Sequence, residues 1–346
     1  MGFSIRSATR KGALVAFLGT MALTPIAAAQ DSTPIPYTAP DDIAEISGTI
    51  EADGSSTVGP VTEAVIEEFA AVAPEISVTN GVSGTGGGFE RFTIGEIPIA
   101  NASRAIAEDE VALAAENGID YYRLDIAYDG ISVVVSAEND FIETLTVEQL
   151  AQLWGAEGGV TNWSDLDPSW PEEPVELYGP GADSGTFDFF NEAILGEDLA
   201  PRTDYNPSED DNVLVEGVAG SPNALGYFGF AFYEANADSL RLVPIDAGDG
   251  PVEPSVETIG DGSYAPLSRP LFIYVNAESL QSDPALQEFL RFYLASSADL
   301  SADVGYVALP AEIGVEQQSK LEGAISGEVE PDSASAGATP EGTPAT

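Results

Sequence analysis

Three segments of the chain share one pattern, in which an extended apolar run leads through a turn of serine, threonine and glycine into apolar residues at helical spacing. The three turns are Gly54-Ser55-Ser56-Thr57, Ser83-Gly84-Thr85-Gly86-Gly87-Gly88 and Ser184-Gly185-Thr186. After the first turn, Val61, Val65 and Phe69 recur at helical spacing, and after the second we expect a shorter helix that starts near Phe89. Strand-like and helix-like patterns alternate between about residues 46 and 325, which is typical of an α/β fold.

Each of these turns places hydroxyl groups at the start of a helix. The first N–H groups of a helix have no partner within the helix and carry a partial positive charge, so such a turn can bind an anion. One serine or threonine there usually only caps its helix, but three turns of one kind favour a shared oxyanion site. Ser103 and Arg104 follow a buried-looking strand and would add a hydroxyl and a guanidinium that binds oxygens in pairs. The alternative for Arg104 is a surface ion pair.

The third turn also carries the tetrapeptide Asp183-Ser184-Gly185-Thr186, which marks the catalytic carboxylate of an aspartic protease. That mechanism needs a second copy so that two carboxylates share one proton, and residues 53–57, DGSST, do not supply it. A phosphoryl-transfer enzyme with Asp53 as nucleophile is a further alternative. Such chemistry generally uses a lysine or bound Mg²⁺, and the only lysine beyond the N-terminal segment is Lys320. Binding without catalysis is the better interpretation.

Composition excludes further classes of function. The chain has 346 residues, 44% of them hydrophobic, which is enough for one large domain or two lobes. It contains no Cys and no His, which excludes thiol nucleophiles, Ser-His-Asp triads and zinc sites with His or Cys ligands. We expect neither a metal site nor a cofactor. The 58 acidic and 11 basic residues give a net charge of −47, which argues against nucleic acid and anionic membranes as partners.

The N-terminus is typical of a cleaved secretory signal. Arg6, Arg10 and Lys11 precede the apolar run 12–23, and the small residues 27–29 provide a cleavage site near Ala29. The run is too short for a stable membrane anchor. Because no Cys is present to carry a lipid, we expect a soluble protein in the periplasm or outside the cell. Residues 30–45 and the Pro-, Thr- and Ala-rich acidic residues 326–346 are predicted to be a flexible linker and a disordered tail.

Several segments together resemble the periplasmic phosphate-binding subunit of the bacterial ABC phosphate importer. The segments are DGSSTVGP, GVSGTGGGFERFTIGE, ANASRAI, YGPGADSGTFDFF, SEDDNVLVEGVAGSPNALGYFGFAFY and PLSRPLFIYV. The resemblance covers about residues 46–312 and is closest to the form in which the ASR segment supplies an arginine. It implies a type 2 periplasmic-binding-protein fold, in which two α/β lobes joined by crossing strands close on one inorganic phosphate. It also implies delivery of the phosphate to a membrane permease by a monomer.

The resemblance implies phosphate contacts residue by residue. From the first turn it implies the Thr57 hydroxyl and the Val58 N–H, with Ser56 adjacent, and from the second either Ser83 or Thr85. From the opposite lobe it implies the third turn, Ser184, Gly185 and Thr186. Other members of the family have an aspartate that accepts the ligand proton where this chain has Arg104, and an arginine where it has Pro180.

This departure puts the proton acceptor in doubt. Asp129 and Asp183 are the candidates, although an aspartate in such a position is more often simply a turn or cap residue. A carboxylate acceptor would favour phosphate, which keeps a proton near neutral pH, over sulfate, which does not. A receptor for another tetrahedral anion, sulfate or molybdate, is the alternative function.

The resemblance also suggests lobe boundaries: residues 46–130 with 259–325 for the first lobe, and 131–258 for the second. In the second lobe, Thr146-Val147-Glu148-Gln149 is a capping-box pattern that opens a helix. Trp154, Trp163 and the run 225–233 are expected to pack in the core. Arg269, before Pro270, is expected to pair at the hinge, and nothing in the sequence brings it nearer to the ligand.

Overall fold

The computed structural model describes residues 35–182, 184–196 and 199–335. The strands are β1 (Gly48–Gly54), β2 (Ile76–Asn80), β3 (Ile99–Ala102), β4 (Tyr121–Ser136), β5 (Leu145–Thr146), β6 (Glu176–Gly179), β7 (Asn206–Pro207), β8 (Ala224–Gly229), β9 (Leu240–Leu242), β10 (Ile245–Asp246), β11 (Pro251–Val252), β12 (Ser268–Asn276) and β13 (Val307–Ala308). The helices are η1 (Ile43–Glu45), α1 (Gly59–Val72), α2 (Gly84–Phe92), α3 (Glu108–Glu116), α4 (Val147–Trp154), η2 (Trp163–Asp165), α5 (Gly185–Ile194), α6 (Asp211–Ala219), α7 (Phe230–Ala235), α8 (Val256–Gly260), α9 (Ala277–Ser282), α10 (Pro284–Asp303), α11 (Ala311–Ser326) and α12 (Asp332–Ser335).

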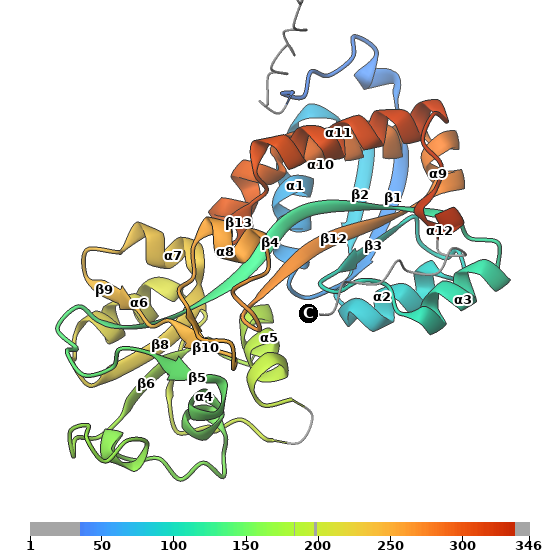
Figure 1. The fold of residues 1–346 in the computed structure, drawn as a ribbon. Helices are drawn as coiled ribbons and strands as arrows, with labels where there is room; N and C mark the ends of the chain where they lie inside the picture. The colour runs from blue at the N-terminus through green and yellow to red at the C-terminus, as the bar shows by residue number, and fades with distance from the viewer. Residues whose placement is uncertain (1–34, 183, 197–198, 336–346) are drawn as a thin grey trace, which may run out of the picture. The chain divides into compact units, whose positions relative to one another are not determined.

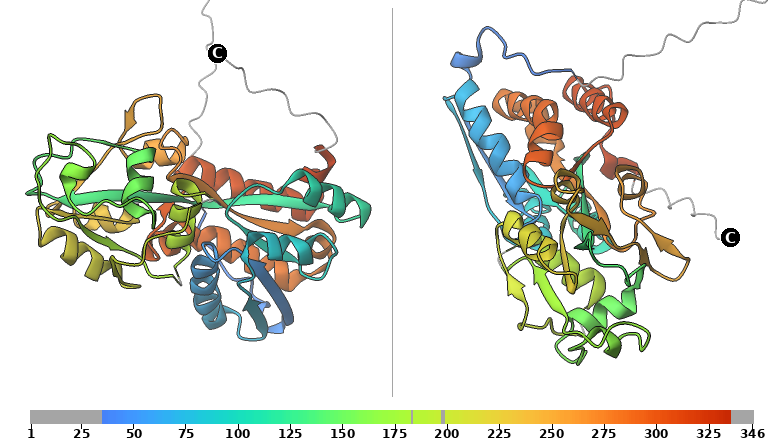
Figure 2. Two further views of the ribbon diagram at one scale, coloured as in Figure 1. Left: turned by 90° about the horizontal axis from the view of Figure 1, so that it is seen from below. Right: turned by 90° about the vertical axis from the view of Figure 1, so that its left-hand side faces the viewer.

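The main sheet has the strand order β2-β1-β3-β12-β4-β8-β6-β7, with β13 and β9 also paired to β4. The long strand β4 connects its two parts (Figures 1 and 2). The first part of β4, Tyr121 to Gly130, pairs antiparallel with β12, and the part from Ile131 onward pairs with β8 and β9. We call the part built on β1, β2, β3, β12 and the start of β4 lobe I, and the part built on the end of β4, β6, β7, β8 and β9 lobe II. The predicted α/β fold of two lobes joined by crossing strands is confirmed.

Alternation along the strands produces the layers of lobe I. In β12, Ile273 and Val275 belong to one apolar cluster with the residues of α1 and α10, whereas Phe272 and Tyr274 belong to another with Phe89 of α2. This separation follows from the two-residue period of a strand. Helices therefore cover both faces of the sheet (Figure 1).

Lobe II has its own core, and the expected tryptophans lie in it. Trp154 and Trp163 are buried, and Phe190 of α5 stacks on Tyr227 of β8 with ring centroids 3.8 Å apart. The predicted capping box also forms, because Thr146 accepts a bond from the Gln149 N–H while the Gln149 side chain accepts one from the Thr146 N–H.

The second turn differs from the sequence prediction. Helix α2 begins at Gly84, not near Phe89, so its glycines lie inside the helix. The reason is packing: a Cβ on Gly88 would lie 2.6 Å from the Gly54 Cα and 2.9 Å from the Asp53 carbonyl oxygen. Glycine lets this helix approach the end of β1.

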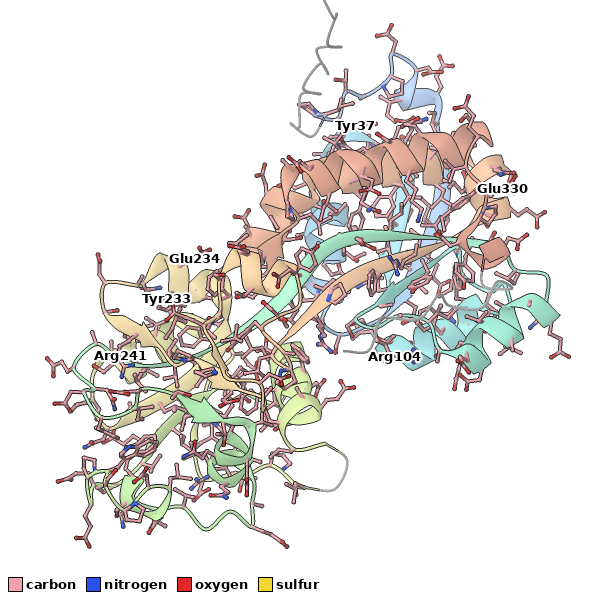
Figure 3. The ribbon with its side chains drawn as sticks, viewed as in Figure 1. Tyr37, Arg104, Tyr233, Glu234, Arg241 and Glu330 are labelled. Carbon is pink, nitrogen blue, oxygen red and sulfur yellow. The ribbon has the colours of Figure 1, made fainter. Side chains whose placement is uncertain are left out.

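The chain ends also differ from the prediction where they are described. Near the N-terminus, the Tyr37 hydroxyl donates to Glu288 of α10 at 2.9 Å (Figure 3). Near the C-terminus, Asp332 pairs with Lys320 at 2.8 Å and accepts from the Arg123 N–H, and the Val329 carbonyl accepts from the Tyr122 hydroxyl. Residues 326–335 are thus held by side-chain contacts that composition alone does not reveal. The predicted signal peptide, residues 1–29, and residues 336–346 of the predicted tail lie outside the described residues.

Candidate functional site

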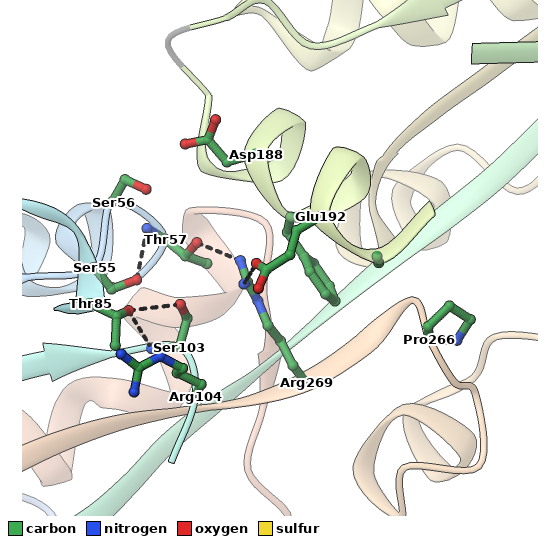
Figure 4. A pocket seen from close by; sticks show the side chains of 12 residues that line it. Ser55, Ser56, Thr57, Thr85, Ser103, Arg104, Asp188, Glu192, Pro266 and Arg269 are labelled. Atoms are coloured by element: carbon green, nitrogen blue, oxygen red, sulfur yellow. Dashed lines mark hydrogen bonds and ion pairs between the residues drawn. The ribbon is translucent and has the colours of Figure 1, made fainter. Parts of the chain in front are cut away.

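A pocket of about 400 Å³ is bordered by both lobes (Figure 4). Lobe I contributes Ser55, Ser56, Thr57, Thr85, Ser103 and Arg104; α5 contributes Asp188, Phe189, Glu192 and Ala193; Pro266 precedes β12 and Arg269 lies in it. Five hydroxyl groups and two guanidinium groups therefore face one space, together with two carboxyl groups. The described residues contain no group of three or more acidic side chains that could hold a metal ion.

The first turn is fixed at the end of β1. Gly54 has φ +139°, and a Cβ there would lie 2.2 Å from the Asn101 carbonyl oxygen, so only glycine fits. The Ser55 hydroxyl accepts the N–H groups of Thr57 at 3.2 Å and Val58 at 3.4 Å, which fixes the turn that leads into α1. Ser56 and Thr57 line the pocket, and Val58 is fully buried.

The second turn distinguishes the two residues that the sequence left as alternatives. Thr85 lines the pocket beside Ser103, with 3.1 Å between their hydroxyl oxygens, and the Ser103 N–H donates to the Thr85 hydroxyl. Ser83 is not among the pocket residues, and its N–H donates to Asp53 at 3.0 Å. Thr85 is therefore the residue of this turn that an oxyanion in the pocket can reach.

The third turn lies beside the pocket. Ser184 caps α5 by accepting the Thr186 N–H at 3.2 Å, and a Cβ on Gly185 would lie 3.0 Å from the Thr57 Cα. None of Ser184, Gly185 and Thr186 is among the pocket residues, and those that α5 contributes begin at Asp188. Asp183 lies outside the described residues.

Arg104 lines the pocket and also makes the ion pair that the sequence offered as its alternative. Both terminal nitrogens bond to the Glu110 carboxylate at 2.8 Å, which raises the pKa of Arg104. Its side chain is 43% exposed and lies near the end of β3 (Figure 3). A pocket ligand would share this guanidinium with Glu110.

Arg269 is one of the pocket residues that sequence reasoning missed, together with the α5 residues Asp188 and Glu192. Its Nη2 donates to the Thr57 hydroxyl at 2.7 Å, its Nε lies 3.3 Å from Asp129 Oδ2 and its Nη1 lies 3.7 Å from Glu192 Oε2. The guanidinium carbon also lies 3.7 Å from the Phe189 ring centroid, within the range of a cation–π contact. One guanidinium thus joins β12, the first turn, β4 and α5 (Figure 4).

Asp129, a candidate proton acceptor in the sequence, lies behind Arg269 and not on the pocket. Its side chain is fully buried, and its Oδ1 has no hydrogen-bond partner in the described part of the chain. Burial raises the pKa of Asp129, and the charge of Arg269 opposes this. The geometry makes Asp129 a residue that holds Arg269 in position.

Comparison with known proteins identifies the family. Residues 39–297 match the model of the PBP superfamily domain. The chain belongs to the PBP superfamily. It is 47% identical to Protein SphX of Synechocystis over 270 residues, 78% of this chain and 80% of that protein. It is 41% identical to phosphate-binding protein PstS of Staphylococcus saprophyticus over 281 residues, 80% of this chain and 86% of that protein.

Solved structures of this superfamily agree with the fold. A possible phosphate-binding protein from Planctomyces limnophilus is 44% identical, with a TM-score of 0.77 over 81% of this chain and 99% of that one. A putative phosphate ABC transporter substrate-binding protein with bound phosphate, from Clostridium perfringens, is 27% identical, with a TM-score of 0.50 over 76% of this chain and 100% of that one. All the pocket residues of this PBP-superfamily chain lie within the matched region.

Proposed function

We propose that the chain captures inorganic phosphate between lobes I and II and delivers it to an ABC transporter permease. The observation that carries the proposal is the pocket, in which five hydroxyl and two guanidinium groups face one space bordered by both lobes. Such a set of donors suits an anion with several oxygens. The names of the Staphylococcus relative and of the Clostridium structure with bound phosphate support phosphate as that anion.

In the proposed complex, the hydroxyls of Ser56, Thr57, Thr85 and Ser103 donate to phosphate oxygens, and Arg269 supplies the central positive charge. Arg269 suits this role because Asp129 and Phe189 hold its guanidinium beside Thr57. Arg104 contributes by sharing its donors between Glu110 and the ligand.

Closure of the lobes would bring the third turn to the ligand. The pocket is larger than one small anion needs, and Gly185 already packs against Thr57 across the lobes. A small movement of α5 toward the first turn would add the N–H and hydroxyl groups of Ser184, Gly185 and Thr186 to the donors. The N-terminus of α5 would then act as an anion site. We propose lobe boundaries at residues 130/131 and 258/259 for this movement.

The strongly acidic surface does not prevent binding in such a pocket. A net charge of −47 repels phosphate at long range, but salt confines the interaction between exposed charges to about 8 Å at physiological ionic strength. Within the pocket, the nearby guanidinium and N–H groups dominate. The acidic surface therefore lowers the association rate more than the affinity.

We further propose a monomer without catalytic activity that works in the periplasm or outside the cell after removal of residues 1–29. The signal-like N-terminus and the absence of cysteine for lipid attachment support this location. Among the helices that the structure describes, none has the length and apolar character needed to span a bilayer. The ABC permease is the proposed partner in the membrane.

Calorimetric titration of the mature protein, stripped of endogenous ligand by unfolding and refolding, tests the proposal. We expect one phosphate per chain with micromolar or tighter affinity at neutral pH and no heat with sulfate. Tight binding of sulfate alone would keep the receptor function and change the ligand. No binding of either anion at low or high salt would refute the proposal.

A matched pair of arginine variants tests whether phosphate binds in the pocket. Arg104→Gln removes a pocket guanidinium that is 43% exposed, and Arg123→Gln removes one that is 44% exposed and outside the pocket. We expect the first to weaken phosphate binding roughly tenfold or more, because a hydrogen bond to a charged group contributes about 1.5–3 kcal/mol. Arg123→Gln should bind as the wild type does.

A further inference from the structure

Asp53 has a buried carboxylate that lies between the first and second turns. It is not among the pocket residues. Its Oδ1 accepts the Gly54 N–H at 2.8 Å and the Ser83 N–H at 3.0 Å, and its Oδ2 accepts a bond from Arg91 Nη1 at 2.7 Å. One carboxylate therefore bonds to the start of the first turn, to the start of the second turn and to α2, the helix into which the second turn leads.

Two glycines allow the second turn and α2 to lie this close to Asp53. A Cβ on Gly81 would lie 2.7 Å from the Asp53 Cγ and Oδ1, and a Cβ on Gly88 would lie 2.9 Å from the Asp53 carbonyl oxygen. A larger residue at either position would push the chain away from the end of β1, because a well-packed interior has no room for the added atom. The two glycines thus keep the second turn against the carboxylate.

The surroundings of Asp53 favour an ionised carboxylate. Burial raises the pKa of Asp53, but hydrogen bonds from Arg91, Ser83 and Gly54 outweigh this effect and leave the pKa below its usual value. An ionised carboxylate only accepts hydrogen bonds, and those it accepts are stronger than bonds to a neutral oxygen. Asp53 is therefore a fixed acceptor near neutral pH.

Each of the two turns that Asp53 joins places one threonine hydroxyl on the pocket. Thr57 lies in the first turn, and Thr85 lies in the second, two residues after the N–H group that bonds to Asp53. The first turn has a further anchor, because the Ser55 N–H donates to the Asn101 carbonyl oxygen at 2.9 Å. A change at Asp53 should therefore displace Thr85 more than Thr57.

We propose that Asp53 is a positioning residue for anion binding, which fixes the two turns relative to each other so that the hydroxyls of Thr57 and Thr85 reach the same anion. The inference rests on the proposed function, because it concerns the same pocket. Asp53 acts through the turns and does not contact the ligand. Its geometry does not suit the nucleophilic role considered from the sequence, since three donors hold the carboxylate away from the pocket.

The negative charge of Asp53 gives the proposal a distinctive sign. By charge alone, removal of a carboxylate near the pocket would strengthen the binding of an anion. An ion pair with Arg91 that only supports the fold would change the melting temperature and leave the affinity unchanged. Positioning predicts weaker binding, because the second turn loses the acceptor that holds its hydroxyl in place.

Calorimetric titration of Asp53→Asn with phosphate tests the proposal. We expect binding to weaken roughly tenfold or more, equivalent to about 1.4 kcal/mol. In a Thr85→Ala background the same substitution should have a much smaller effect, since the hydroxyl that Asp53 positions is already absent. Glu51→Gln is the matched control. It removes another carboxylate of β1 that bonds to Arg91 at 2.7 Å and, among the described hydrogen bonds, to neither turn, so it should bind phosphate as the wild type does.

Gly81→Ala tests the same contact without a change in charge. The added Cβ would displace the Asp53 carboxylate from the Ser83 N–H, so this variant should also weaken phosphate binding, and it provides the test if Asp53→Asn does not fold. The assignment would be overturned by a folded variant of either kind that binds phosphate at least as tightly as the wild type. Losses that add in full to the loss in Thr85→Ala would also overturn it. Failure of the proposed function is distinct, because wild-type protein would then not bind phosphate at all.

Discussion

Replacement of Arg269 by glutamine tests how the pocket is held together. Arg269 is 14% exposed and its partner Asp129 is fully buried. The substitution removes the only described ion-pair partner of Asp129 and leaves a buried carboxylate whose Oδ1 already has no partner among the described residues. It also removes the cation–π contact with Phe189.

The expected decrease in the free energy of unfolding is large. Removal of one partner of a buried ion pair costs about 3–5 kcal/mol, because the remaining charge is uncompensated. For a domain of this size, 1 kcal/mol shifts the melting temperature by roughly 2 °C, so we expect a decrease of about 6–10 °C. The double variant Asp129→Asn/Arg269→Gln removes the charge as well and should recover at least half of the loss.

The pH dependence gives a second readout with a defined sign. The folded-state pKa of Asp129 is raised, so its contribution to stability is present at low pH and is lost as the pH rises through that pKa. Without Arg269 the pKa rises further, and the stability deficit of Arg269→Gln should be smaller at acidic than at neutral pH. Thermal melts without phosphate measure both effects. A loss below about 1 kcal/mol, or a double variant no more stable than Arg269→Gln, would refute the reasoning.

Three other properties follow from the structure. Phe190→Ala should lower the free energy of unfolding by about 3–5 kcal/mol in urea titrations, because Phe190 is fully buried and stacked on Tyr227; a loss below about 1 kcal/mol would contradict this packing. Burial, followed by the charge of Asp210, raises the pKa of Asp211 to about 6, so ionised Asp211 destabilises the fold above that pH. Asp211→Asn should therefore melt higher than the wild type at neutral pH and equally in acid, and a lower melting temperature at neutral pH would argue against it. Added salt should speed phosphate association in stopped-flow measurements, since it screens a net charge of −47; a strong decrease would show that steering by the pocket arginines dominates.

The sequence predicts those parts of the fold that depend on local pattern. The starts of α1 and α5, the Thr146 capping box and the buried tryptophans all follow from spacing and turn residues that lie close together in the chain. The predicted start of α2, near Phe89, was wrong. The glycines before Phe89 lie inside the helix because they allow its close contact with β1, and a local sequence pattern does not show such a tertiary contact.

The site is predicted less completely, because it depends on register and on helix faces. Arg269 meets Asp129 through the antiparallel register of β12 and β4, which a single sequence does not reveal. Likewise, spacing shows that Asp188 and Glu192 share a face of α5, but not that this face borders the pocket. The Thr57 hydroxyl, after a predicted strand, could be proposed from sequence because its turn carries the signal, whereas the second turn left Ser83 and Thr85 as alternatives.

The location of the bound anion tests the central claim most directly. Crystals of the mature protein grown with phosphate, and again with arsenate, whose anomalous scattering marks its position, would show where a tetrahedral anion binds. We predict one anion per chain between the lobes, bonded to the Thr57 hydroxyl and the Arg269 guanidinium, with the same position for both anions. An empty pocket at saturating phosphate, or an anion bound only elsewhere on the chain, would contradict the account.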